Sequence, residues 1–185
     1  MSSPTPTPDP GPGGSGDTGG PAPAPPAPTT ATGSPVSGQP TPEPEATAAV
    51  QTALRTEHAA VWSYGLIAAF LPASLDPRAK EDLAAHRARR DATMRLLADS
   101  GVPSVAAEPA YRTPNPVTDQ ESAMRLAVAA EADSAAAWEA VLGSCDDQGL
   151  RHAALDGLSD AAVRGGRWSE QLGESPPVPP FPGHT

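Results

Sequence analysis

Two glutamates that could take part in metal or acid–base chemistry stand where a helix should bury apolar side chains. Glu57 lies in the middle of an apolar stripe at helical spacing over residues 50–70, and Glu131 holds the same place in a second stripe over 118–142. A carboxylate on a buried face needs a partner, because burial without one is costly or forces the group to take up a proton. A bound cation or a basic side chain could supply that partner.

A third helical stripe, over residues 76–100, has two polar residues one turn apart, His86 and Arg90, on the face that should be apolar. A di-iron four-helix bundle takes one Glu from each of two helices and a Glu-x-x-His pair from each of the other two. His86 would need an acid at position 83, but Leu83 stands there and Asp82 is displaced by one residue. The third stripe consists of Ala79, Leu83, His86, Arg90, Met94 and Leu97.

A fourth stripe, over residues 148–172, is flanked by Asp160 and Arg164, which are spaced as an i,i+4 ion pair. It also lacks the di-iron pattern, because Asp160 would need a histidine at the position of Val163. Arg90, in contrast, is a fixed cation that donates bidentately to carboxylates and cannot ligate a metal. Placed between the two buried glutamates, it would neutralise both of them.

These patterns predict a buried ion-pair network in place of a metal centre, with no catalytic residue and no cofactor. The network consists of Glu57, His86, Arg90, Glu131, Asp160 and Arg164. Two alternatives stay open: an atypical iron or manganese site, and a small-ligand or acid–base site built from the same groups. The ligands of that metal site would be Glu57, His86 and Glu131, with Asp160 as a further candidate. Tyr64, Trp138 and Trp168 are expected to be packing residues, with Tyr64 placed to hydrogen-bond the network.

Four helices of about 24 residues each are predicted to hold these side chains. They span residues 45–71, 76–100, 118–142 and 148–172. Short loops join the first helix to the second and the third to the fourth, so each pair forms an antiparallel hairpin. The proline-rich segment 102–117 between the pairs predicts an extended crossover. The sequence therefore predicts an all-α, ferritin-like four-helix bundle made of two hairpins and one long crossover.

The folded unit is expected to span residues 45–173. Residues 1–44 hold 14 of the 25 prolines and 8 of the 17 glycines, and they contain no Lys, Arg, Leu, Ile, aromatic residue or Cys. Such a segment buries too little apolar surface to offset the entropy of ordering, so it is predicted to be a disordered tether. Residues 174–185 are predicted to form a short proline-rich tail.

The acidic balance of the chain bounds its partners and its location. The formal net charge is −10 and only three acids lie in the tether, so the helical part is itself acidic and nucleic acid is not an expected partner. No run of 18 apolar residues occurs, which predicts no membrane span. No signal peptide is recognisable, which indicates a cytoplasmic protein as the sequence is written. A start upstream of Met1 would instead favour an extracytoplasmic or lipid-anchored protein.

The end of the first helix is apolar almost all round. Leu66, Ile67 and Phe70 point away from the stripe that carries Glu57. Apolar side chains on several faces must be covered by more than one neighbour or by another subunit. This surface is the expected site of a homodimer. The leading interpretation of function is an interaction or scaffold role, and the sequence does not identify the protein partner.

Several of these residues occur in short motifs that resemble one family. The motifs are Glu57-His58 through Tyr64-Gly65, the HRARRD run at 86–91, Tyr111 followed by PNPVTD at 114–119, Glu131 with Trp138, Arg164 and Arg167-Trp168, and FPG at Phe181. Together they are similar to the actinobacterial ferritin-like family called domain of unknown function 4439. The resemblance covers about residues 50–183 and implies a ferritin-like bundle whose molecular role is not established.

Overall fold

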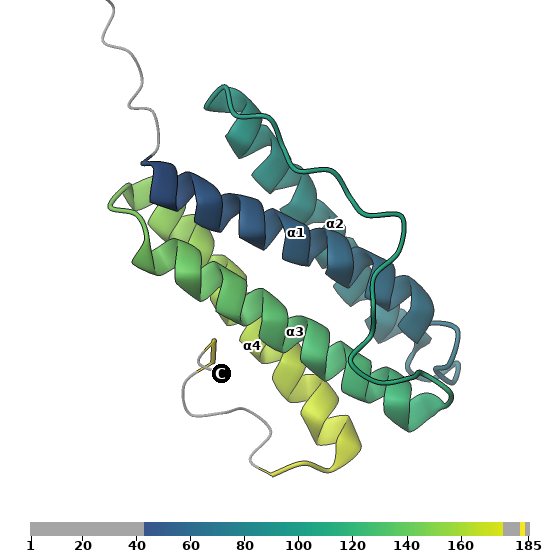
Figure 1. Ribbon diagram of the computed structural model, residues 1–185. Coiled ribbons are helices and arrows are strands. Elements are labelled where there is room, and N and C mark those ends of the chain that lie inside the picture. Colours follow the sequence, from purple (N-terminus) through teal and green to yellow (C-terminus); the bar gives the residue numbers. More distant parts are fainter. Residues whose placement is uncertain (1–42, 176–181, 184–185) are drawn as a thin grey trace, which may run out of the picture. The chain divides into compact units, whose positions relative to one another are not determined.

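The computed structural model of the chain describes residues 43–175 and 182–183, and four long helices make up most of this part (Figure 1). The helices are α1 (Pro44–Ile67), α2 (Asp76–Asp99), α3 (Gln120–Gly143) and α4 (Gln148–Leu172). No strand occurs within the described residues, which confirms the predicted all-α fold class. The predicted tether, residues 1–44, lies outside the described residues except for its last two, and so does most of the predicted tail.

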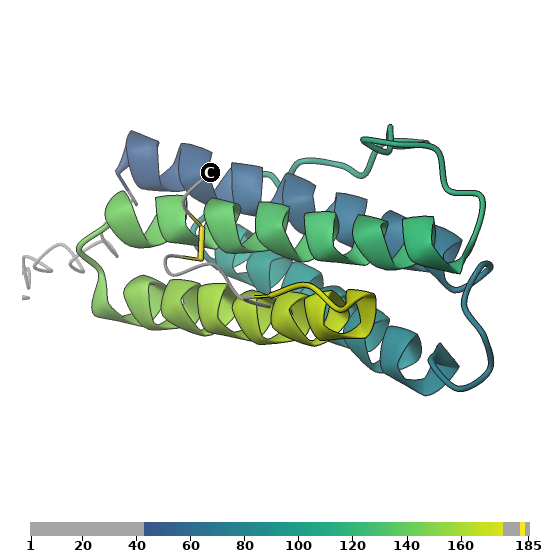
Figure 2. The same cartoon turned by 90° about the horizontal axis from the view of Figure 1, so that it is seen from below.

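The four helices form two antiparallel hairpins, α1 with α2 and α3 with α4, as predicted. Residues 68–75 join the first pair and residues 144–147 join the second. The connection between the pairs, residues 100–119, returns along the length of the bundle, so that α3 runs antiparallel to α1 (Figures 1 and 2). No helix in the described part of the chain combines the length and apolar character that a membrane crossing requires.

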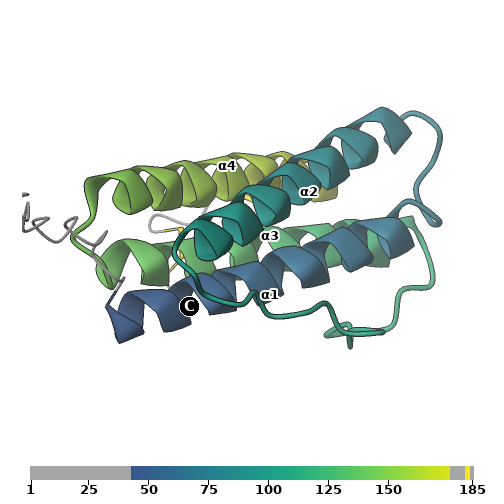
Figure 3. The ribbon, with the colours of Figure 1, turned by 90° about the horizontal axis from the view of Figure 1, so that it is seen from above.

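The crossover lies along the outer side of α1 (Figure 3) and is hydrogen-bonded to it. The side-chain amide of Gln51 donates to the carbonyl of Pro103 at 2.6 Å and accepts from the backbone N–H of Val105 at 2.9 Å. Further along, the ring of Tyr111 lies 6.0 Å from that of Trp62. A Gln side chain that satisfies both a carbonyl and an N–H holds this irregular segment without a strand partner.

Local side-chain chemistry sets the ends of the helices. The N-cap of α3 is Asp119, whose carboxylate accepts from the backbone N–H of Ser122 at 2.8 Å, while the Ser122 hydroxyl accepts from the Asp119 N–H at 3.0 Å. A reciprocal pair of this kind satisfies two helix-terminal donors. In the same hairpin, Asp147 caps α4 and Gly173 ends it in the left-handed conformation, with a φ of 74°.

The core has two apolar clusters, one toward each end of the bundle. The first contains Ala46, Val50, Ala53, Leu54, Leu97, Ala137, Trp138, Val141, Leu150 and Ala154. The second contains Tyr64, Ile67, Ala79, Ala123, Met124, Leu126, Ala127 and Trp168. Glu57, His86 and Glu131 fall between these clusters in sequence on three different helices, and all three are fully buried. The charged residues therefore occupy a middle layer that apolar side chains shield on both sides.

The end of α1 differs from the expectation of an open apolar surface. Ile67 is fully buried in the second cluster, so it cannot contribute to a dimer contact. Leu66 and Phe70 are partly buried and pack against the same cluster. The neighbouring helices and loop thus provide much of the cover that another subunit was expected to supply, and a homodimer through this surface stays a prediction.

Two glycines on one face of α4 let it approach α3 closely. A Cβ atom built at Gly157 would lie 2.6 Å from Cγ of Trp138, and one built at Gly165 would lie 3.2 Å from Cβ of Glu131. Contacts as short as the first do not occur between real side chains. The absence of a side chain at Gly157 therefore leaves room for the Trp138 ring between the helices.

Replacing Gly157 with Ala should destabilise the protein by about 1 to 3 kcal/mol, because the added methyl group overpacks the contact with Trp138. The matched control is Gly65→Ala. Gly65 is exposed in α1, and a Cβ atom added there would have no neighbour within 4 Å, so its replacement should stabilise the helix by about 1 kcal/mol. Urea unfolding followed by circular dichroism measures both. Equal effects of the two substitutions would contradict this account of the α3–α4 contact.

Candidate functional site

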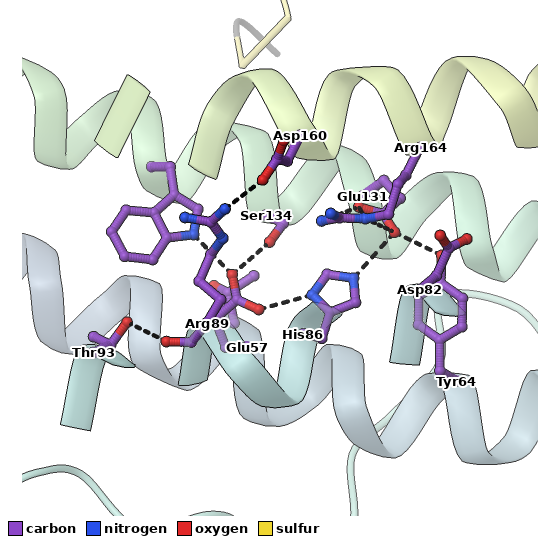
Figure 4. Close-up of polar contacts among 12 residues, drawn as sticks. Glu57, Tyr64, Asp82, His86, Arg89, Thr93, Glu131, Ser134, Asp160 and Arg164 are labelled. Carbon is purple, nitrogen blue, oxygen red and sulfur yellow. Dashed lines mark hydrogen bonds and ion pairs between the residues drawn. The ribbon is translucent and has the colours of Figure 1, made fainter. Parts of the chain in front are cut away.

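One imidazole spans two carboxylates at the centre of the bundle (Figure 4). Nδ1 of His86 lies 2.7 Å from Oε2 of Glu57, and its Nε2 lies 3.0 Å from Oε1 of Glu131. The three residues come from α2, α1 and α3, and none of them reaches solvent. Because carboxylates accept hydrogen bonds, a ring that donates from both nitrogens satisfies the two acids at once and carries a positive charge.

The second oxygen of Glu57 also has donors. Oε1 accepts from the hydroxyl of Ser134 at 3.0 Å and from the indole N–H of Trp138 at 2.7 Å. Both donors are on α3, one turn apart, and both are buried. Each oxygen of this buried carboxylate is therefore hydrogen-bonded, as burial of a charge requires.

The Glu131 carboxylate accepts hydrogen bonds from three side chains of the site. The Arg164 guanidinium donates to both of its oxygens, with Nε 3.0 Å from Oε1 and Nη2 3.0 Å from Oε2. The hydroxyl of Tyr64 donates to Oε1 at 2.6 Å. With His86, these contacts bring one imidazole, one guanidinium and one phenol onto a single carboxylate, so a fixed cation from α4 completes the layer.

A third acid, Asp82, lies beside this group and is also buried. Its Oδ2 accepts from the indole N–H of Trp168 at 2.9 Å, and the Tyr64 hydroxyl is 3.4 Å away. The same indole nitrogen is 3.0 Å from the Tyr64 oxygen. Trp168 therefore provides Asp82 with the kind of hydrogen bond that Trp138 provides to Glu57.

Burial and neighbouring charges act in opposite directions on these groups. Burial disfavours the imidazolium of His86, but hydrogen bonds and charges from Glu131 and Glu57 outweigh it and raise the pKa of His86 to about 9. Burial would raise the pKa of Glu131, yet His86 and Arg164 lower it below its usual value. Two anions and two cations then cancel, because Glu57 and Glu131 face His86 and Arg164.

Asp82 is the third buried acid of the layer, and Glu57 and Glu131 already balance the charges of His86 and Arg164. Burial and the nearby charge of Glu131 raise the pKa of Asp82 above its usual value. The same two influences raise the pKa of Tyr64 well above its ordinary range, so its hydroxyl keeps its proton and acts as a donor. A proton on Asp82 would leave the layer electrically neutral.

Four of the six residues predicted for the network meet in this layer: Glu57, His86, Glu131 and Arg164. Arg90 does not. Its guanidinium pairs with Asp91 at 2.8 Å on the partly exposed side of α2. Asp160 is also outside, since it pairs with Arg89 and its side chain is 57% exposed. The prediction that Arg90 neutralises the two glutamates is wrong, because Arg164 from α4 occupies that place.

The rotation of α2 about its axis explains this difference. The buried residues of α2 are Ala79, Asp82, His86, Thr93 and Leu97. The predicted stripe shared three of these but placed Leu83, Arg90 and Met94 inside, and Met94 is 38% exposed. Turning the inward face from Leu83 to Asp82 brings a carboxylate to Trp168 and moves Arg90 toward solvent.

Sequence reasoning missed Asp82 as a buried group and the two indole donors as more than packing residues. Part of the signal was present. Ser134 and Trp138 follow Glu131 by three and seven residues, so all three lie on one face of α3. Asp82 precedes His86 by one turn. Polar residues repeated at helical spacing within a buried stripe indicate a connected network, where each alone would pass for packing.

The polar groups of the layer are hydrogen-bonded mainly to one another. Both nitrogens of His86 face carboxylates, and both oxygens of Glu131 are held by Arg164. Within residues 43–175 and 182–183, no group of three or more His, Cys, Asp or Glu side chains is placed to hold a metal ion. The alternative set of Glu57, His86 and Glu131 would have to give up contacts on both glutamates to bind iron or manganese.

Comparisons with known proteins agree with this fold. Residues 49–185 match the sequence profile of the family described as "Domain of unknown function (DUF4439)". A crystal structure described as a conserved hypothetical protein, rv2844, from Mycobacterium tuberculosis is similar, with 34% sequence identity and a TM-score of 0.68. The similarity covers 69% of this chain and 97% of that chain. The search of curated proteins found no match.

Replacing Arg164 with Gln should destabilise the fold by about 3 to 5 kcal/mol, because it leaves the buried charge of Glu131 without its fixed cation. Arg90→Gln is the matched control. Arg90 makes only a partly exposed pair with Asp91, so its loss should cost about 1 kcal/mol or less. Chemical denaturation of both variants measures the difference. A loss of stability in Arg90→Gln as large as that in Arg164→Gln would contradict the geometry.

The stability of the protein should fall as the pH rises from neutral through 9. The folded state raises the pKa of His86 from 6.5 to about 9, so the folded state binds this proton more tightly than the unfolded chain. The resulting stabilisation is complete below pH 6.5 and is lost as His86 deprotonates, an effect of about 3 kcal/mol.

Unfolding free energies measured from pH 6 to 10 test this, together with a nuclear magnetic resonance titration of the histidine rings. The control is His152→Gln, which removes a histidine with a 79% exposed side chain and should leave the pH dependence unchanged. A titration of His86 near its ordinary pKa of 6.5 would disprove the bridged imidazolium.

Proposed function

Because the chain belongs to the DUF4439 family, whose description assigns no activity, we propose from its own geometry that it is a non-catalytic helical bundle acting as an interaction or scaffold module. In this proposal the buried network takes the place that a di-iron centre has in ferritin-like proteins. Two central glutamates from α1 and α3 are common to both arrangements. Here an imidazolium and a guanidinium supply the positive charge.

The bridge made by His86 carries this proposal. A metal-ligating histidine offers an unprotonated ring nitrogen to the ion. Both ring nitrogens of His86 are instead within 3.0 Å of a carboxylate oxygen, and the neighbouring acids favour the protonated ring. The geometry therefore favours ion pairing over coordination at this position.

Burial of the network also argues against catalysis. A general acid or base must come within hydrogen-bond reach of its substrate. Glu57 and His86 are completely buried and Glu131 is 1% exposed, and each is hydrogen-bonded to other side chains of the layer. Groups in this state hold one another in place and do not face a substrate.

An interaction role is the remaining class that the bundle supports. A buried ion network fixes the register of helices more reliably than it adds stability, so it suits a rigid module whose surface is used for binding. The net charge of −10 favours partners with basic or neutral surfaces over nucleic acid.

The protein should contain well under one equivalent of iron, manganese or zinc per chain after expression with added metal and mild purification. Inductively coupled plasma mass spectrometry measures this, and calorimetric titration with Fe²⁺ or Mn²⁺ should show no stoichiometric binding. Glu131→Gln and Glu121→Gln form a matched pair, since Glu121 is an exposed residue of the same helix. One ion per chain that is retained in Glu121→Gln and lost in Glu131→Gln would overturn the proposal.

A further inference from the structure

A cleft of about 360 Å³ lies between α2 and α4, outside the charged layer. The backbone of α2 approaches α1 more closely than it approaches α4. Most walls of the cleft are small or apolar side chains, and the ring of Trp138 forms part of its lining. The small side chains include Ala88, Ala92 and Ala153. This volume is within the range of small-molecule sites and near its lower end.

One ion pair crosses the cleft. Nη2 of Arg89, on α2, donates to Oδ2 of Asp160, on α4, at 2.6 Å (Figure 4). The Arg89 guanidinium also lies over the ring of Trp138, with Cζ 5.6 Å from the ring centroid. A positive group is thus held against an indole face inside an otherwise apolar cleft, which is the usual composition of a ligand site with one orienting polar group.

The two side chains of this ion pair differ in their exposure to solvent. The side chain of Arg89 is 20% exposed, whereas that of Asp160 is 57% exposed. A mostly buried guanidinium requires an anion nearby, but a mostly exposed carboxylate is well solvated by water without a partner. Asp160 can therefore leave at little cost, provided that another anion replaces it on Arg89.

We propose that this cleft binds a compact apolar monocarboxylate. The carboxylate of the ligand takes the place of Asp160 and accepts two hydrogen bonds from the Arg89 guanidinium in a bidentate geometry. The apolar body of the ligand lies against Trp138 and covers the methyl groups of Ala88, Ala92 and Ala153. The proposal does not depend on what occupies the centre of the bundle, so it can fail or succeed independently of the role proposed above.

The Arg89–Asp160 pair favours a carboxylate ligand over an amine or an uncharged compound. An amine would compete for Asp160 and leave the mostly buried Arg89 without its anion. A neutral compound of the same shape would gain the apolar contacts but no partner for the guanidinium. An anion should thus bind more tightly than its uncharged or cationic counterpart, and removal of the competing Asp160 should strengthen that binding.

Isothermal titration calorimetry of the full chain with octanoate and with benzoate tests the proposal, with octanamide and octylamine as uncharged and cationic counterparts. We expect saturable binding of at least one carboxylate, about tenfold or more tighter than octanamide or octylamine. Asp160→Asn should tighten the binding several-fold, and Arg89→Gln should weaken it about tenfold or more.

A second pair of variants separates the cleft from the rest of the surface. Ala92→Leu fills the cleft and should abolish binding, whereas Ala84→Leu, at an exposed position of α2 outside the cleft lining, should leave it unchanged. Circular dichroism verifies that each variant is folded. Absence of saturable binding by both carboxylates, equal binding of octylamine, or affinity unaffected by Asp160→Asn and Ala92→Leu would each overturn the proposal.

Discussion

The whole bundle depends on a single hydrogen-bonded ion arrangement, the His86 imidazolium held between Glu57 and Glu131 with Arg164 on the far carboxylate. These four residues come one from each helix, so none of the helices can slide or rotate without breaking a buried charge contact. Leaving a buried charge unpaired is far more costly than losing an exposed pair. The layer therefore specifies the register of the fold, in addition to whatever stability it adds.

The rest of the core keeps water away from this layer and completes its hydrogen bonds. Apolar clusters lie on both sides, and the low dielectric that they create strengthens each ion pair while raising the cost of an unpaired group. At the two ends of the layer, Trp138 and Trp168 donate to Glu57 and Asp82. An arginine from α2 covers each indole, Arg89 over Trp138 and Arg78 over Trp168. Each tryptophan thus lies between a buried carboxylate of the network and a partly exposed arginine.

Much of the fold could be predicted because its signals are local. Proline, glycine and capping acids mark the helix ends, and the proline-rich spacing of 102–117 indicates a crossover. The prediction failed where two local solutions were nearly equivalent. The third helix is predicted to begin at residue 118, where Thr118 and Glu121 have the spacing of a capping box, but the pair that forms is Asp119 with Ser122. Residue types alone do not decide between these two pairs.

The sequence by itself determined that four helices form two hairpins and that Glu57, His86 and Glu131 are buried in their middle, because residue spacing along a helix is a local property. Only the tertiary structure decided which cation neutralises the acids. The weak apolar stripe of α2 allows more than one rotation about the helix axis, and contacts with α1, α3 and α4 select the one that buries Asp82 and exposes Arg90. The position of Arg164 likewise depends on how closely α4 approaches α3 at Gly165, a distance that no pattern within one helix can set.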